Sequence, residues 1–185
     1  ETLEGSDRAR QELVATGDLR AIGPLITAFE SQDAGVREAA VRALQASRRR
    51  EAVGPLIDRP RQGPPPVRVA AARVLGALPH DGRAIGPLVE ALASPDQQVR
   101  KTVAWALGEL GDQRAVEPLV RTLGDQDSIV RRQAADALAK LQEPVGRLIS
   151  DLLEGSEQAL KDLAASRDPR SIAPLVAAIQ SPQTG

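Results

Sequence analysis

The chain has 185 residues, a formal net charge of −1, an apolar fraction of 42% and neither cysteine nor methionine. The missing cysteines exclude disulfides, thiolate metal sites and cysteine nucleophiles, and the near-zero net charge does not favour a nucleic-acid partner. No apolar run long enough to cross a membrane and no secretion signal is evident, so we expect a cytoplasmic protein without a membrane partner. Because even position 1 lacks Met, we expect a piece excised from a longer chain.

A five-residue motif recurs along the chain and sets its period. It reads AIGPL at 21–25, AVGPL at 52–56, AIGPL at 84–88, AVEPL at 115–119 and SIAPL at 171–175. The prolines of the first four copies are 31, 32 and 31 residues apart, and a Val-Arg pair begins 12 residues after each of them. Two motifs in a fixed relation indicate an internal repeat of about 31 residues.

Each repeat is predicted to form two helices. In the third repeat, Ile85, Leu88 and Leu92 stand at i, i+3 and i+7, which is the apolar stripe of an amphipathic helix. A second helix follows between Asp96, which can cap its N-terminus, and Gly111, which suits its C-terminus. One such pair cannot bury its apolar stripes alone, so the pairs are expected to stack.

In chain order, we predict a second-type helix at about 7–16, five helix pairs and a final first-type helix at about 170–181. The second pair (about 51–78) and the fifth pair (about 143–166) depart from the motif. All of these pairs are expected to form a single domain over residues 1–185. The open repeats at both ends are expected to contact either a second copy or the rest of a parent chain.

The second pair contains the stretch DRPRQGPPPVR, at residues 58–68. It is not a linker, because the motif spacing is kept through it. Pro60 stands where the other repeats have Phe29, Leu92 and Leu123, so we expect the first helix to end near Asp58 and to forfeit the burial of a leucine-type side chain. We predict a softer joint here, inside a segment (residues 36–73) whose nine arginines and three acidic residues give a local charge of +6.

The motifs resemble the HEAT-like repeats named after the phycobilisome (PBS) lyases, the E-Z type HEAT repeats. One copy reads DxRAVxPLV from Asp112, DxxVR from Asp127 and AAxAL from Ala134, and the resemblance covers roughly residues 7–182. It implies an all-α fold, a right-handed α-α superhelix (solenoid) of stacked antiparallel helix pairs whose second helices line a concave face. The family includes lyase subunits, chaperone-like proteins and adaptors.

Charged residues that recur with the repeat are interpreted as structural. Aspartates lie three residues before the repeat valines, where an N-cap is needed, and arginines directly follow those valines. The aspartates are Asp33, Asp96 and Asp127, and the arginines are Arg37, Arg68, Arg100 and Arg131. We expect a ladder in which each arginine pairs with a loop aspartate of its own or a neighbouring repeat.

Positions that vary on the second helices form the predicted partner-binding groove. They are Arg42, Arg73, Lys101, Trp105, Arg132 and Asp136. Trp105, the only tryptophan, is one position off the apolar stripe, so we expect it at the groove edge. An exposed tryptophan beside cationic side chains is typical of an interaction hot spot. The alternative is that Trp105 is partly buried against a neighbouring helix.

The sequence offers little for catalysis. The single histidine, His80, lies in a loop, and there is neither tyrosine nor cysteine, so we predict no catalytic residue, no metal site, no cofactor and no enzyme activity. The predicted function is a scaffold or adaptor that binds a protein or peptide, and an acidic one is favoured because arginine suits carboxylates. The resemblance implies an alternative, a lyase or chaperone-like subunit that handles a bilin or another cofactor. Nucleic-acid binding through the basic N-terminal half is a second alternative, disfavoured by the single stacking aromatic.

Overall fold

The computed structural model describes residues 19–78 and 81–141, and these residues form helices and turns without a strand. The first helices of successive pairs are α2 (Ile22–Thr27), α4 (Val53–Leu56), α6 (Ile85–Ala91) and α8 (Val116–Thr122). The second helices are α3 (Ala34–Ser47), α5 (Pro65–Ala77), α7 (Gln97–Leu110) and α9 (Ser128–Lys140). Short 3-10 turns precede the first helices at Leu19–Ala21, Arg50–Ala52, Gly82–Ala84 and Gln113–Ala115, and another, Ala28–Glu30, follows α2.

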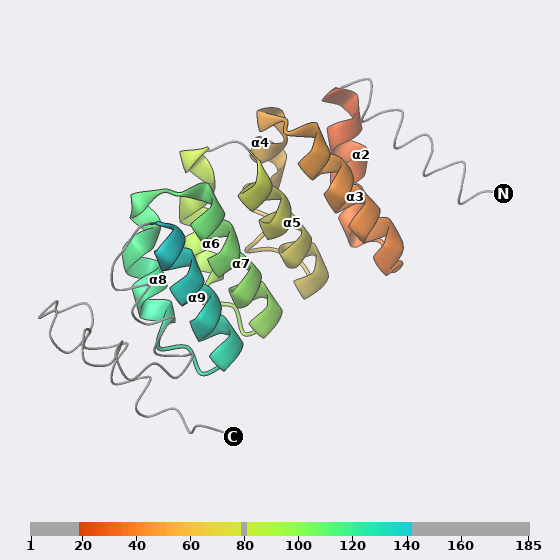
Figure 1. Cartoon of the computed structure of the whole chain (residues 1–185). Coiled ribbons are helices and arrows are strands. Elements are labelled where there is room, and N and C mark those ends of the chain that lie inside the picture. The colour runs from red at the N-terminus through yellow and green to blue at the C-terminus, as the bar shows by residue number, and fades with distance from the viewer. Residues whose placement is uncertain (1–18, 79–80, 142–185) are drawn as a thin grey trace, which may run out of the picture.

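The pairs stack in chain order into a two-layered solenoid (Figure 1). Helices α3, α5, α7 and α9 lie side by side in one layer, and the first helices form the other layer. Packing is most extensive between α5 and α7 and between α7 and α9, and it is less extensive between α3 and α5. The predicted all-α solenoid of about 31-residue helix pairs is confirmed for the described part of the chain.

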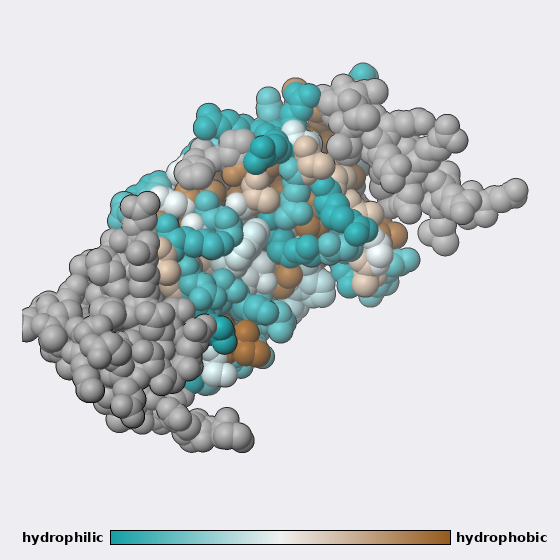
Figure 2. Space-filling model, in the orientation of Figure 1, coloured by the Kyte–Doolittle hydropathy of each residue, from teal (hydrophilic) through white to brown (hydrophobic). Residues whose placement is uncertain are grey.

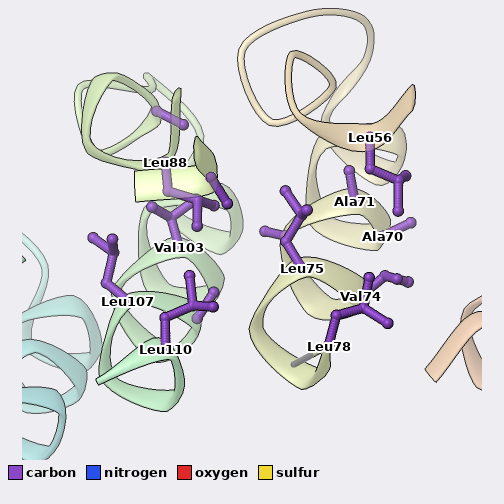
Figure 3. Close-up of a cluster of buried hydrophobic side chains, with 14 of the residues drawn as sticks. Leu56, Ala70, Ala71, Val74, Leu75, Leu78, Leu88, Val103, Leu107 and Leu110 are labelled. Atoms are coloured by element: carbon purple, nitrogen blue, oxygen red, sulfur yellow. The ribbon is translucent and has the colours of Figure 1, made fainter. Parts of the chain in front are cut away.

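The core lies between the two layers and continues from repeat to repeat. The leucine of the repeated motif is buried in the four copies within the described residues, and Leu56, Leu88 and Leu119 have no exposed surface. In Figure 3, Leu56 from α4 lies over Ala71 of α5, and Leu88 from α6 lies over α7. Burying one such side chain stabilises the fold by about 1.5–3 kcal/mol, so the motif leucine explains why each first helix stays on its partner.

Local signals set the ends of the second helices. The side chains of Asp33, Asp96 and Asp127 accept backbone N–H groups at the starts of α3, α7 and α9, which satisfies donors that have no partner within the helix. Helix α7 is followed by Gly111, whose φ of 67° is left-handed. The equivalent residue after α3 is Arg48, which adopts a φ of 48°.

The second repeat keeps its place in the stack with a shortened first helix. Helix α4 has 4 residues and ends at Leu56, just before Asp58, whereas α6 and α8 have 7 residues each. Pro60 is itself buried, so it fills part of the position of the leucine-type side chain, and the expected loss of burial there is only partial. Helix α5 begins at Pro65, since its first turn needs no N–H from that residue.

Several sequence predictions lie outside the described residues. These are the helices at about 7–16 and 170–181, the fifth pair at about 143–166 and the loop histidine His80. Within residues 19–78 and 81–141, no helix combines the length and the apolar character that a membrane crossing requires.

Candidate functional site

The repeated arginines bind backbone carbonyl groups near the start of their own helices. In three repeats, Nη1 donates to the carbonyl oxygens six and five residues earlier, at 2.7–3.2 Å. The acceptors are Ser31 and Gln32 for Arg37, Ser94 and Pro95 for Arg100, and Asp125 and Gln126 for Arg131. In the second repeat, Nε of Arg68 donates to the carbonyl of Pro60 at 2.8 Å. Each arginine therefore fastens the turn of its own repeat, which is a structural role.

The predicted ladder of ion pairs needs a correction. Arg100 does bridge two repeats, because its Nε and Nη2 bind the two carboxylate oxygens of Asp125 at 2.7 and 2.9 Å. Both side chains are about nine-tenths buried. Arg37 and Arg68 instead bind carbonyl groups. The repeat aspartates cap helices, since an aspartate at an N-cap is already engaged by the backbone.

Three neighbouring second helices surround a hollow of about 270 Å³. It is lined by Arg73 from α5, by Lys101, Thr102 and Trp105 from α7, and by Gln133 from α9. Lys101 and Trp105 are four residues apart and therefore share one side of α7. The face formed by α3, α5, α7 and α9, here called the second-helix face, thus places three of the six predicted groove residues at one site.

Trp105 forms the apolar wall of this hollow. It is half-buried and packs against the hydrophobic core. Its ring reaches α5 at Gly76, where an added Cβ would come within 2.9 Å of the ring carbon Cζ3. The alternative of partial burial against a neighbouring helix therefore describes Trp105, and this burial leaves the ring at the edge of the second-helix face. The ring still lines the hollow.

An ion pair between α3 and α5 occupies one end of the site. Nη1 and Nη2 of Arg73 donate to the two carboxylate oxygens of Glu38, at 2.5 and 2.9 Å. The hydrogen bonds from Arg73 lower the pKa of Glu38, although burial opposes the shift, and nearby Arg42 lowers this pKa further. The same hydrogen bonds raise the pKa of Arg73. Glu38 and Arg73 therefore stay charged at neutral pH.

The remaining predicted groove residues do not line the hollow. Arg42 is exposed on α3, and Arg132 and Asp136 lie on α9. Thr102 and Gln133 line it although they were not predicted as site residues. Both are direct neighbours of predicted cations, and the repeat pattern alone does not say which of two adjacent positions turns toward the next helix.

Cross-repeat ion pairs reduce the charge of the basic segment at residues 36–73. Nη1 of Arg59 binds Glu30 of the preceding repeat at 2.9 Å, and Nη1 of Arg61 binds Glu90 of the following repeat at 2.6 Å. The two arginines flank Pro60, so the shortened repeat is linked to both neighbours. In the described ranges, no three His, Cys, Asp or Glu side chains are grouped as a metal site would need.

A family model for HEAT repeats matches residues 55–139 and 85–156, which together span more than half of the chain. The chain belongs to the HEAT repeat family. All five residues that line the hollow fall within the matched HEAT repeats. The match is to HEAT repeats in general and does not identify the phycobilisome lyase type.

Solved helical-repeat proteins share the fold of these HEAT repeats. A designed armadillo repeat protein in complex with the peptide (KR)4 is 19% identical with a TM-score of 0.53, over 94% of this chain and 85% of that chain. Another designed armadillo repeat protein is 22% identical with a TM-score of 0.51, again over 94% and 85% of the two chains. At this identity the likeness shows the fold alone. No curated protein matches the chain in sequence.

Proposed function

We propose that this HEAT-repeat chain is a non-catalytic scaffold or adaptor module that binds a peptide or a protein segment on its second-helix face. The hollow beside Trp105 carries the proposal, because it joins a half-buried aromatic ring to cationic and neutral polar side chains. Hot spots of protein interfaces are enriched in tryptophan and arginine. The face shown in Figure 2 is mostly hydrophilic with small pale and brown patches, a mixture that suits the polar rim of an interface.

The size of the hollow suits one or two side chains of a bound segment. Pockets for drug-sized ligands span roughly 300–1,000 Å³ and enclose most of the ligand. The hollow measures about 270 Å³, just below that range, and it is open to solvent. A segment of a partner lying across α5, α7 and α9 would therefore insert one or two side chains at this point.

Charge favours an acidic segment. The lining contains Arg73 and Lys101 but no carboxylate, and complementary charge selects the partner and speeds its association. A basic peptide such as the (KR)4 bound by the designed armadillo protein would meet like charge here. A nucleic acid is less well suited, because Arg59 and Arg61 are already paired with glutamates of neighbouring repeats.

The test is a selection of random peptides on the whole chain, followed by capture with variants. Trp105→Ala combined with Arg73→Glu is expected to abolish capture of the selected peptides while the helical circular dichroism signal stays unchanged. Arg121→Glu is the matched control, because Arg121 lies on α8 in the other layer and its side chain is 70% exposed. Unchanged capture by the double variant would refute the proposal. An absorbance shift on mixing the chain with bilin pigments would favour the lyase-type role instead.

A further inference from the structure

We infer that the hollow at Trp105 binds a carboxylate of the partner, and that Glu38 competes with this carboxylate for the guanidinium group of Arg73. The inference rests on the proposed function, because it names the chemistry of the partner at the same face. It also predicts that replacing Glu38 should raise the affinity for the partner, which the proposed function alone does not predict.

The cationic lining supplies the first argument. Arg73 and Lys101 approach the hollow from two adjacent helices, and Thr102 and Gln133 add neutral hydrogen-bonding groups. Among the described residues, Lys101 makes no hydrogen bond or ion pair, so its ammonium group can bind an incoming anion. Hydrogen bonds between a cationic donor and a carboxylate are about twice as strong as neutral ones. A carboxylate therefore suits this lining better than any other peptide group.

Trp105 supplies the second argument, because it sets what lies beside the carboxylate. Its ring is a flat apolar wall of the same hollow, and such rings contribute most when an apolar or aromatic group packs on them. The expected occupant is thus an Asp or Glu side chain of the partner with an apolar side chain next to it in the bound segment.

Glu38 supplies the third argument, because it already occupies the Arg73 guanidinium group. Both carboxylate oxygens of Glu38 are bound by the two Nη atoms of Arg73, which leaves that edge of the guanidinium without room for a second bidentate carboxylate. An incoming carboxylate must therefore displace Glu38 or bind more weakly beside it. The carboxylate of Glu38 thus takes the place on Arg73 that a carboxylate of the partner would take.

The exposure of this ion pair makes the exchange feasible. The side chains of Arg73 and Glu38 are 36% and 40% exposed, and ion pairs that water reaches are weak and easily exchanged. The pair of Arg100 and Asp125 shows the contrast, since those side chains are only 7% and 10% exposed. The buried pair of Arg100 and Asp125 joins two repeats, whereas the pair of Arg73 and Glu38 lies at the site and can dissociate when a ligand binds.

The experiment uses peptides selected on the full chain and lacking tryptophan. Their binding is measured by the fluorescence of Trp105, the only tryptophan of the protein. Four proteins are compared: the unmodified chain, Glu38→Gln, Arg73→Met, and the variant that carries both Glu38→Gln and Arg73→Met. We expect the selected peptides to contain Asp or Glu beside an apolar residue. Glu38→Gln should bind them about two- to fivefold tighter, as loss of one exposed competing pair allows. The gain should vanish in the Arg73→Met background, because Glu38 acts through Arg73.

The outcomes separate this inference from the proposed function. An equal gain in both backgrounds would show a general effect of charge and overturn the inference. Selected peptides that bind at Trp105 without acidic residues would overturn it too, while the proposed function stands. If no peptide binds, or if Trp105 does not respond, both fail. Glu117→Gln on α8 is the control, with unchanged affinity expected. If Arg73→Met loses helicity, Arg73→Lys, which cannot bind bidentately, replaces it.

Discussion

Gly76 on α5 lies directly against Ala106 on α7. A Cβ added at position 76 would come within 2.8 Å of the Cα of Ala106. One repeat later the contact recurs, since a Cβ at Gly108 would come within 2.8 Å of the Cα of Ala137. These two glycines let α5, α7 and α9 approach closely, and the same approach brings the residues of the hollow together.

The corresponding contact between α3 and α5 is built from larger residues. Gln45 and Val74 hold the positions that a glycine and an alanine hold in the next two interfaces. Nε2 of Gln45 donates a hydrogen bond to the carbonyl of Arg73 at 3.0 Å. The bulk of these side chains accounts for the less extensive packing of α3 on α5.

Substituting Gly108 by Ala should lower the free energy of unfolding by about 1–3 kcal/mol, because the added methyl group overpacks the interface of α7 and α9. Urea denaturation measures this change. The control is Gly86→Ala on α6, where nothing lies within 4 Å of the new Cβ and the equivalent residue of α8 is Glu117. A change no larger than about 0.5 kcal/mol is expected there. Equal losses at the two positions would contradict the close-contact explanation.

Substituting Arg48 by Gly should stabilise the protein by about 1 kcal/mol. Arg48 has the left-handed φ and ψ of 48° and 29°, at the place where α7 has Gly111, and a residue with a Cβ is disfavoured in that conformation. Urea or thermal denaturation again gives the answer. The neighbouring Arg49 is extended, with a φ of −87°, so Arg49→Gly should destabilise slightly instead. If Arg48→Gly were less stable than the unmodified protein, the left-handed conformation of Arg48 would not be what limits the stability of this helix end.

The sequence predicts the frame of the fold because the frame depends on local signals. Proline near the first turn, aspartate at the N-cap and apolar spacing each act within one helix pair, so one repeat suffices to recognise them. The partners of Arg100 and Arg59 were not predictable in the same way. Their acceptors Asp125 and Glu30 lie 25 and 29 residues away in other repeats, and only the stacking of the helices decides which carboxylate is near.

Only part of the candidate site could be predicted from the sequence, because the rest depends on how neighbouring helices pack. Arg73, Lys101 and Trp105 stand out because they vary where the frame repeats, and the structure brings these three together. Thr102 and Gln133 stand at a position that varies as well, but the sequence does not choose between it and the adjacent position of Lys101 and Arg132, because that choice depends on the rotation of α7 and α9. The pairing of Glu38 with Arg73 depends likewise on the contact between two helices.

Removal of the Arg100 side chain should destabilise the stack more than removal of an exposed arginine. Arg100→Met leaves the carboxylate of Asp125 buried without its guanidinium partner, and breaking a buried pair in this way lowers the free energy of unfolding by about 3–5 kcal/mol. Arg121→Met is the matched variant, because the pair of Arg121 and Glu117 is 70% and 81% exposed. At most about 0.5 kcal/mol is expected for it. Similar urea midpoints for the two variants would show that the Arg100 pair is not what joins these repeats.

Hydrogen exchange should identify the second repeat as the softest joint of the described stack. Helix α4 has only 4 residues, and the α3–α5 interface beside it is the less extensive one. Amides in residues 51–66 are therefore expected to exchange faster than those in residues 83–95. The ion pairs of Arg59 and Arg61 with neighbouring repeats act against opening, but they are partly exposed and weak. Equal exchange in the two segments would show that the shortened helix does not soften the joint.

The fluorescence of Trp105 during peptide titration tests the binding proposal most directly, since no other tryptophan contributes to the signal. Its midpoint is compared with the anisotropy midpoint of the same peptide carrying a fluorescent label. The second-helix face as binding site predicts a saturable change in Trp105 emission at the same midpoint, and loss of peptide binding in the Trp105→Ala, Arg73→Glu variant. A peptide that saturates by anisotropy, leaves Trp105 emission unchanged and binds the double variant equally well would contradict it.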